Sequence, residues 1–375
     1  MMKQIDFREL ANESIRHLTP YQPGKPIEEL ERELGITSSI KLASNENPIG
    51  PSPKAIDAIK KSLQQAHIYP DGSGYELKKA LAEYLSVSSN QLTLGNGSEN
   101  ILELIVKSYL SKNDTAVISQ YAFLTIPILI KSYGAITNVV PAKNWGHDIL
   151  GMLNAIDNKT RVLFLVNPNN PTGTYTNKTD FETLLKNVPS EILIVVDEAY
   201  SEYIHQDDYP IALNYLANHP NLIITRTFSK IYGLAGLRLG YAISSPEIAD
   251  ILNRARLPFN VNSLAAKAGC AALIDDDHIQ QSVTMNNQGM QQLQAGLKQL
   301  NIDYIPSIGN FITIDVKDAA RVYQQLLLQG IIVRPLQAYG MPKHIRVTIG
   351  TAEQNKRFLN AIRLVLQTFC EQGVV

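Results

Sequence analysis

Residues 225–241 read Thr-Arg-Thr-Phe-Ser-Lys-Ile-Tyr-Gly-Leu-Ala-Gly-Leu-Arg-Leu-Gly-Tyr, and the chain is organised around this stretch. Its one lysine, Lys230, stands among small and apolar residues and follows an apolar run at 221–225. A buried ammonium is costly unless it is paired or chemically used. In a partly desolvated pocket the pKa of a lysine is lowered, so that its neutral amine can attack an aldehyde. The stretch therefore indicates a lysine that forms a Schiff base.

The same stretch offers groups that bind a phosphate. Thr227 and Ser229 supply hydroxyls, Arg238 supplies a forked cation, and the glycines let the backbone approach a ligand closely. Pyridoxal 5'-phosphate (PLP) carries both an aldehyde and a phosphate, and this combination of groups predicts it as the cofactor. A serine-lysine pair before a glycine-rich loop also occurs in ordinary turns, so the rest of the chain has to decide between the two.

The composition excludes several classes of protein. The 375 residues have the hydrophobic content (45%) and charged content (18%) of an ordinary globular protein, with length for two or three domains. The net charge of -1 gives no sign of binding to nucleic acid or anionic membranes. No apolar run is long enough to span a bilayer, and the N-terminus does not read as a signal peptide. Cys270 and Cys370 fit a reducing compartment, most simply as core residues, and we predict a cytoplasmic protein.

Proline and glycine divide the chain into an arm and two domains. Residues 18–26 are too rich in both for a helix or a central strand, so we expect an N-terminal arm at 1–26. Short apolar strands then alternate with helices, and we predict a large PLP-binding α/β domain at 48–274. Residues 27–47 and 275–375 are predicted to form a smaller α+β domain from both parts of the chain.

The large domain is predicted to contain a mostly parallel, doubly wound sheet. Its strands are expected at 91–94, 116–119, 162–166, 192–196, 222–225 and 239–243, with helices at 53–66, 75–85, 99–110 and 179–186. Strand 192–196 is apolar on both faces, which is typical of a sheet covered on both sides. Alternating strands and helices imply right-handed crossovers and parallel pairing. Elsewhere we expect a helix at 27–34, helical segments from about 263 to 300, a helix that ends at 329 and a helix at 352–371. Strands are expected at 41–43, 310–316, 331–334 and 345–349.

Polar residues follow the predicted strands at the edge where parallel sheets bind ligands. Asp197 follows strand 192–196 and can bond a protonated pyridine nitrogen, although alone it reads equally well as a helix cap or a solvated turn acid. Asn170 follows strand 162–166 and can donate to the ring oxygen of the cofactor. Phe123 follows strand 116–119 and can stack on the ring, although a lone aromatic residue usually belongs to the core.

Two further positions predict anion binding. Gly97 and Ser98 lie in a glycine-rich turn before helix 99–110, where free N–H groups and the helix dipole bind phosphate. In strand 345–349 the period of two places the apolar side chains on one face and Arg346 on the other, toward solvent or a cleft. A guanidinium fork suits a carboxylate or a phosphate. We predict no metal site.

Three motifs resemble the signatures of class I and II aminotransferases, which have the fold-type-I PLP architecture. They are the lysine stretch from Ser229 to Gly240, Asn-Asn-Pro-Thr-Gly at 169–173 and Asp-Glu-Ala-Tyr at 197–200. Within that family, other motifs are most similar to those of histidinol-phosphate aminotransferases. These are Pro-Tyr-Gln-Pro-Gly at 20–24, Leu-Ala-Ser-Asn-Glu-Asn-Pro at 42–48, Tyr-Pro-Asp-Gly at 69–72, Val-Arg-Pro at 333–335 and Ile-Arg-Val-Thr-Ile-Gly at 345–350. The resemblance runs from the arm to residue 350 in consistent order.

The resemblance implies roles for individual residues. It implies that Lys230 is the Schiff-base lysine and the acid–base group, and that Asp197 pairs with the pyridine nitrogen. It also implies that Asn170 and Tyr200 bind the ring oxygen, and that Phe123, rather than Tyr121, stacks on the ring. The residues implied to bind the cofactor phosphate are Gly97, Ser98, Thr227, Ser229 and Arg238. Those implied to bind the anionic end of the substrate are Tyr21, Arg334 and Arg346. Tyr69 is implied to reach the cofactor phosphate of a neighbouring subunit, so a homodimer is expected.

The resemblance also implies the reaction. It interconverts L-histidinol phosphate and 2-oxoglutarate with imidazole acetol phosphate and L-glutamate, a step of histidine biosynthesis. Three alternatives stay open: an aromatic amino-acid aminotransferase of the same family, a decarboxylase of the same fold for a phosphorylated amino acid, and a PLP-sensing regulatory module. The last expects an N-terminal DNA-binding domain, and the arm is too short for one and not basic. Small-molecule substrates are expected, with no nucleic-acid or membrane partner.

Overall fold

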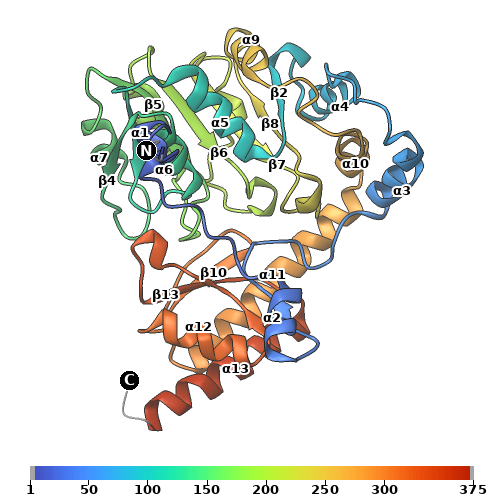
Figure 1. Cartoon of the computed structure of the whole chain (residues 1–375), viewed down its shortest axis with the longest axis vertical. Coiled ribbons are helices and arrows are strands. Elements are labelled where there is room, and N and C mark those ends of the chain that lie inside the picture. Colours follow the sequence, from blue (N-terminus) through green and yellow to red (C-terminus); the bar gives the residue numbers. More distant parts are fainter. Residues whose placement is uncertain (1–4, 372–375) are drawn as a thin grey trace.

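The computed structural model describes residues 5–371, and its centre is a seven-stranded sheet with the strand order β2-β8-β7-β6-β5-β3-β4 (Figure 1). Neighbouring strands are parallel except at β8, which is antiparallel to both β2 and β7. The strands are β2 (Leu92–Gly95), β3 (Thr115–Ser119), β4 (Ile136–Val140), β5 (Thr160–Val166), β6 (Leu193–Asp197), β7 (Leu222–Thr227) and β8 (Gly240–Ile243). The predicted α/β class and mostly parallel sheet are confirmed.

Helices pack on both faces of this sheet. Along β5, Leu163 and Leu165 belong to one core cluster, whereas Val162 and Phe164 belong to the other. The first cluster includes residues of α3 (Pro53–Ser62), α4 (Tyr75–Leu85), α7 (Ile149–Asn154), α8 (Lys178–Asn187) and α10 (Ser263–Leu273). The second includes residues of α5 (Ser98–Tyr109), α6 (Thr125–Ser132) and α9 (Pro246–Ala255). Because successive strand residues point to opposite faces, strands that are apolar throughout need this double cover.

A smaller antiparallel sheet of four strands lies beside the large one, with the order β12-β13-β10-β9. Its strands are β9 (Tyr304–Ile305), β10 (Phe311–Asp315), β12 (Arg334–Pro335) and β13 (His344–Thr348). Their apolar side chains pack against α11 (Asp276–Gln299), α12 (Ala319–Leu328) and α13 (Ala352–Glu371). Close by, β1 (Ile40–Lys41) pairs with β11 (Ile331–Ile332), and α2 (Ile27–Leu34) packs its Leu30 against Ile332. Early and late parts of the chain therefore build this unit together.

One predicted strand is divided in the structure. The strand expected at 331–334 becomes β11, which pairs with β1, and β12, which pairs with β13. This division places Arg334 directly opposite Arg346 across β12 and β13. Between β11 and β12 the chain passes from one pairing partner to another, which a local pattern does not report. The helical segments expected at 263–300 are α10 and α11, which are separated after Leu273.

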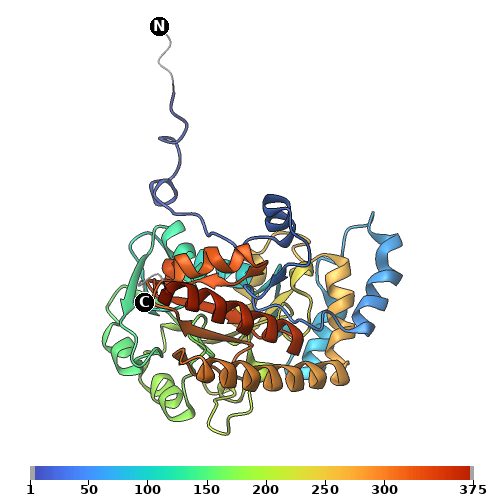
Figure 2. The same cartoon turned by 90° about the horizontal axis from the view of Figure 1, so that it is seen from below.

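Residues 5–26 form the arm. It contains one short helix, α1 (Glu13–Arg16), which the sequence did not predict and which packs against α6. The Ser14 hydroxyl donates to the Ser132 carbonyl oxygen at 2.9 Å. Residues 5–12 extend away from the body of the molecule (Figure 2). No helix within residues 5–371 has the length and apolar character to cross a membrane.

Candidate active site

A cavity of about 410 Å³ lies at the carboxyl ends of β5, β6 and β7, beside the N-terminus of α5. Parallel sheets commonly bind ligands at this edge. The structure brings together in its lining most of the residues predicted for the site: Ser98, Phe123, Asn170, Asp197, Tyr200, Thr227, Ser229, Lys230 and Arg238. Tyr121, in contrast, packs against Trp145 and does not line the cavity.

Lys230 extends into this cavity with one hydrogen-bond partner. Its Nζ donates to the Ser44 carbonyl oxygen at 3.1 Å and lies 5.7 Å from the centre of the Tyr200 ring. Burial, followed by repulsion from Arg346, lowers the pKa of Lys230 to about 8. A neutral amine is therefore far more accessible here than on a lysine in water, as a nucleophile requires.

Asp197 ends β6 and is buried. Its Oδ1 accepts a hydrogen bond from the Thr225 hydroxyl at 3.0 Å, because these residues lie opposite each other across β6 and β7. Burial raises the pKa of Asp197 to about 6, against the lowering effects of Thr225 and Lys230. A carboxyl held in this way favours a ligand that brings a positive charge to it.

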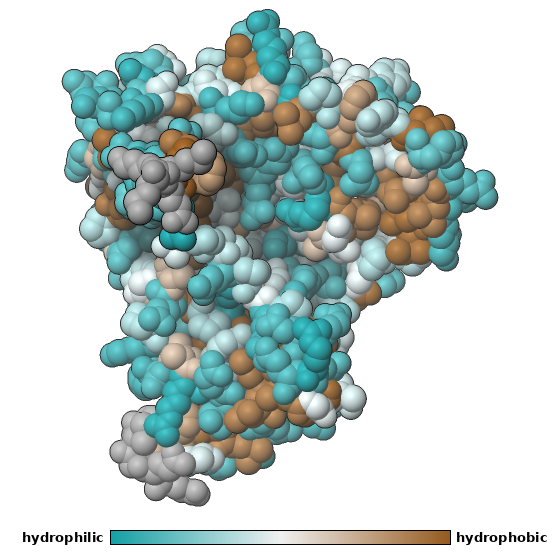
Figure 3. All heavy atoms as spheres, in the orientation of Figure 1, coloured by the Kyte–Doolittle hydropathy of each residue, from teal (hydrophilic) through white to brown (hydrophobic). Residues whose placement is uncertain are grey.

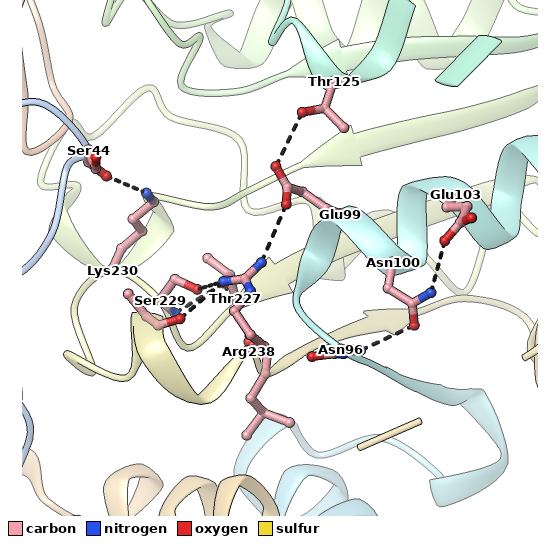
Figure 4. Close-up of polar contacts among 12 residues, drawn as sticks. Ser44, Asn96, Glu99, Asn100, Glu103, Thr125, Thr227, Ser229, Lys230 and Arg238 are labelled. Atoms are coloured by element: carbon pink, nitrogen blue, oxygen red, sulfur yellow. Dashed lines mark hydrogen bonds and ion pairs between the residues drawn. The ribbon is translucent and has the colours of Figure 1, made fainter. Parts of the chain in front are cut away.

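Arg238 joins several groups at the end of the cavity near α5 (Figure 4). Its Nη1 donates to the Ser229 hydroxyl at 3.2 Å, and its Nη2 lies 3.4 Å from a carboxylate oxygen of Glu99. The other oxygen of Glu99 accepts from the Thr125 hydroxyl at 3.2 Å. The Thr227 hydroxyl joins this cluster because it accepts a hydrogen bond from the Ser229 N–H at 3.1 Å. The result is a guanidinium beside the hydroxyls of Thr227 and Ser229, which suits a phosphate, with the Glu99 carboxylate as the ion-pair partner of the guanidinium.

Two glycines allow the close approach that builds this cluster. Gly97 precedes α5 with φ +83°, and a Cβ there would lie 2.5 Å from Arg238 Nη2. A Cβ at Gly240 would lie 2.3 Å from the backbone nitrogen of Ser98. The first turn of α5, whose N–H groups have no partners within the helix, thus comes directly against β8 and Arg238.

Tyr200 and Asn170 line the cavity from the segments that follow β6 and β5, and each has a hydrogen-bond partner. The Tyr200 hydroxyl oxygen accepts from Asn45 Nδ2 at 2.9 Å. Asn170 Oδ1 accepts from Arg346 Nη1 at 2.5 Å, so its amide nitrogen is the group that Asn170 has left to donate.

The predicted substrate-binding residues Tyr21, Arg334 and Arg346 are not part of this lining, and Arg346 contacts one residue that is. Arg346 is buried, donates through Nη2 to the Ala43 carbonyl oxygen at 2.6 Å and reaches the cavity through Asn170. Arg334 is also buried; its Nη1 donates to the Gln22 carbonyl oxygen at 2.7 Å, and its guanidinium lies 5.1 Å from the centre of the Tyr21 ring. Two buried guanidinium groups face each other across paired strands, which is costly without an anion nearby.

Tyr69 is not brought to the cavity of its own chain. It is 80% exposed, and its ring stacks on Phe259 at 4.9 Å. Sequence reasoning also missed four residues that line or support the site: Asn45, Glu46, Glu99 and Thr225. Asn45 and Glu46 lie in the motif 42–48, which signalled them without giving them a role. Glu99 opens the helix after the glycine-rich turn, and Thr225 ends the predicted strand 222–225.

Comparisons with known proteins agree with this arrangement. The family model of class I and II aminotransferases matches residues 37–362. The chain is 51% identical to histidinol-phosphate aminotransferase 1 of Nitrosococcus oceani over 98% of this chain and 100% of that protein. It is 54% identical to histidinol-phosphate aminotransferase 2 of Pseudomonas aeruginosa, over 96% of this chain and 99% of that protein. The crystal structure of histidinol-phosphate aminotransferase from Sinorhizobium meliloti in complex with PLP superposes with a TM-score of 0.88 at 28% identity, covering 96% of this chain and 98% of that one.

Proposed function

The chain belongs to the class I and II aminotransferases, and from this premise we propose that it transfers an amino group between L-histidinol phosphate and 2-oxoglutarate with PLP as its cofactor. In the biosynthetic direction it converts imidazole acetol phosphate and L-glutamate, a step of histidine biosynthesis. Relatives at about half identity over nearly the whole chain support this reaction over the aromatic aminotransferase and the decarboxylase.

The observation that carries the proposal is the meeting of Lys230 and Asp197 in one cavity, each with a shifted pKa. When bound, PLP supplies an aldehyde that joins to an amine and a pyridine ring that accepts electron density. The residues present fit this group, because a depressed lysine pKa favours the reactive amine and a buried carboxylate favours a protonated ring nitrogen. The Lys230 amine, whose Nζ lies in the cavity, would hold or move a proton at that atom.

The other lining residues are assigned to binding the cofactor. We assign the ring oxygen to Tyr200 and Asn170, and the ring face to Phe123. The phosphate is assigned to Gly97, Ser98, Thr227, Ser229 and Arg238. The support for this set is the glycine-permitted contact between β8, Arg238 and the first turn of α5. Charge-assisted bonds from a guanidinium and from a helix N-terminus are those that phosphates receive in proteins.

Tyr21, Arg334 and Arg346 are assigned to the anionic end of the substrate. Glutamate ends in carboxylates and histidinol phosphate in a phosphate, and a guanidinium fork binds either anion. The paired burial of Arg334 and Arg346 supports an anion site on this side of the cavity.

A homodimer and a cytoplasmic location complete the proposal. Apolar side chains gather on the surface over α3, where Ile49, Leu63 and Ile68 are exposed (Figure 3). An exposed apolar patch of this kind marks an interaction surface, and the exposed Tyr69 adjoins it in the chain. The free thiol of Cys270 fits a reducing compartment; the side chain of Cys370 lies outside the described residues.

The deciding experiment compares initial rates with histidinol phosphate, phenylalanine and tyrosine as amino donors. We expect histidinol phosphate to be the preferred donor and Lys230→Ala to abolish turnover. Borohydride reduction of the holoenzyme is expected to leave the cofactor attached to Lys230. Faster turnover of phenylalanine would replace the proposed substrate with an aromatic amino acid, and a label on another lysine would overturn the assignment of Lys230.

A further inference from the structure

Asn45 lies behind the cavity at the meeting point of three segments of the chain. It is 1% exposed, and its backbone adopts the left-handed conformation with φ +56°. Its Nδ2 donates to the Tyr200 hydroxyl oxygen at 2.9 Å, and its carbonyl oxygen accepts from Asn310 Nδ2 at 2.9 Å. Its backbone N–H donates to the Thr348 hydroxyl at 2.9 Å, and that hydroxyl lies 3.2 Å from Asn45 Oδ1. A non-glycine residue is held in this conformation only where its surroundings fix it strongly.

The bonds to Thr348 determine which way the Asn45 amide faces. Thr348 is buried, and its hydroxyl oxygen already accepts the Asn45 backbone N–H. The one hydroxyl proton of Thr348 therefore needs an acceptor, and Asn45 Oδ1 is the acceptor within reach. With Oδ1 turned to Thr348, the NH₂ group must face Tyr200. The reversed amide would leave the Thr348 proton buried without a partner.

We propose that Asn45 is a positioning residue that turns the proton of the Tyr200 hydroxyl toward the ring oxygen of the cofactor. Because the Tyr200 oxygen accepts a hydrogen bond from Asn45, the Tyr200 hydroxyl has to donate its own proton in another direction. Tyr200 lines the cavity, so this direction is toward the cavity. A phenol whose oxygen accepts a hydrogen bond is also a stronger donor, since hydrogen bonds in a chain polarise one another. Asn45 thereby fixes both the direction and the strength of the bond that Tyr200 gives.

The same residue ties this bond to the small sheet. Thr348 ends β13, so the Asn45 amide keeps its orientation only while this strand lies against segment 42–48. Asn310, immediately before β10, holds the backbone carbonyl of Asn45 and not its amide. The inference rests on the proposed function through the cofactor alone and does not depend on which amino donor the enzyme prefers.

The test follows the visible absorption of the holoenzyme against pH. The midpoint of this titration reports the loss of a proton from the bound cofactor. Tyr200 donates to the charged ring oxygen, so loss of that bond raises the midpoint. We expect Tyr200→Phe to raise it by about 1–2 pH units, and Asn45→Gly, which suits the left-handed backbone, to raise it by about 0.5–1 unit. In the double variant we expect a midpoint within about 0.3 pH unit of that of Tyr200→Phe alone, because Asn45 acts through Tyr200.

Asn310→Ala is the matched control, since it removes a bond to the same segment without touching the amide. We expect it to lower the thermal midpoint of unfolding and leave the absorption midpoint at the wild-type value. Should Asn45→Gly fail to fold, Asn45→Asp keeps the shape and tolerates the left-handed backbone. Its carboxylate can only accept, so we expect it to draw the Tyr200 proton away and raise the midpoint further than Asn45→Gly.

An Asn45 variant with the wild-type midpoint would overturn the proposal. So would a double variant whose shift equals the sum of the two single shifts, since Asn45 would then act independently of Tyr200. If the wild-type enzyme instead prefers phenylalanine, the proposed substrate fails while the absorption titration still decides the role of Asn45.

Discussion

Asp197 is a residue whose position costs stability when no cofactor is bound. Its folded pKa is about 6 against an ordinary 3.8, so the folded protein binds the proton more tightly than the unfolded chain does. The free energy of unfolding of the cofactor-free protein should therefore fall as pH rises from about 4 to 6. At pH 8 the cost amounts to about 3 kcal/mol at most.

Asp197→Asn should remove this cost because the amide oxygen can still accept from Thr225. We expect the cofactor-free variant to be more stable than wild type at pH 8 and similar to it at pH 4, while cofactor affinity and turnover fall. Denaturant unfolding at the two pH values checks the first part, and cofactor titration the second. An unchanged pH dependence in the variant would show that Asp197 is not the group responsible.

Arg346 and Arg334 should differ in which half-reaction they serve. Arg346 also holds Asn170, so Arg346→Ala should slow both half-reactions, each by about tenfold to a hundredfold for one lost charge-assisted bond. Arg334 contacts Tyr21 and the arm, and Arg334→Ala should slow the histidinol-phosphate half more than the glutamate half. Single-turnover rates of each half-reaction measure both effects, with the exposed Arg254→Ala as control. Equal slowing of both halves by Arg334→Ala would contradict a phosphate-directed role.

The sequence predicted the residues that end strands, and it missed those that act through distant partners. Lys230, Asp197 and Asn170 each follow an apolar strand, so a parallel sheet brings them to one edge. Asn45 meets Tyr200 across 155 residues, and the bond forms only because segment 42–48 passes between the two sheets. No local pattern in the sequence carries that meeting.

At the scale of elements, the packing of β8 against α5 makes Gly240 a sensitive position. A Cβ there would meet backbone atoms of Gly97 and Ser98, which cannot move as a flexible side chain would. Gly240→Ala should displace the first turn of α5, cost about 1–3 kcal/mol of stability and weaken cofactor binding. Gly146→Ala is the control because its Cβ would meet only ordinary contacts at 3.5 Å. Unchanged cofactor affinity in Gly240→Ala would mean that this turn does not bind the phosphate.

The elements that escaped prediction have physical reasons in common. The helix α6 has a proline and three isoleucines within eight residues, a composition that favours strands or turns over helix. The edge strand β4 has exposed residues on both faces and lacks the apolar run of the central strands. The short strand β9 has two residues and depends on pairing with β10. These elements are determined by their neighbours, whereas α2, α4 and α13 carry their own periodicity and matched the predicted bounds.

At the scale of the whole molecule, the position of Tyr69 leads us to predict active sites that two chains share. Tyr69 is exposed in its own chain and is not among the residues that line that chain's cavity. In a dimer that brings it to the partner's cofactor, Lys230→Ala and a disruptive Tyr69 variant should each be inactive alone. Mixed dimers should then regain activity, because one of their two sites has both groups. Verified mixed dimers that stay inactive would argue against a contribution of Tyr69 across the interface.

The long helix α11 has a thermodynamic consequence for the molecule. It is continuous for 24 residues; Val283 in its first half belongs to the core of the large sheet, and Leu293 and Leu297 in its second half belong to the core of the small one. Neither core can melt without exposing part of a helix that the other one holds. Heating should therefore produce a single calorimetric transition. Cofactor bound at the large sheet should raise the melting temperature of α13, which packs on the small sheet, by the same amount as that of the large sheet. Two separate transitions would show that α11 breaks between the cores.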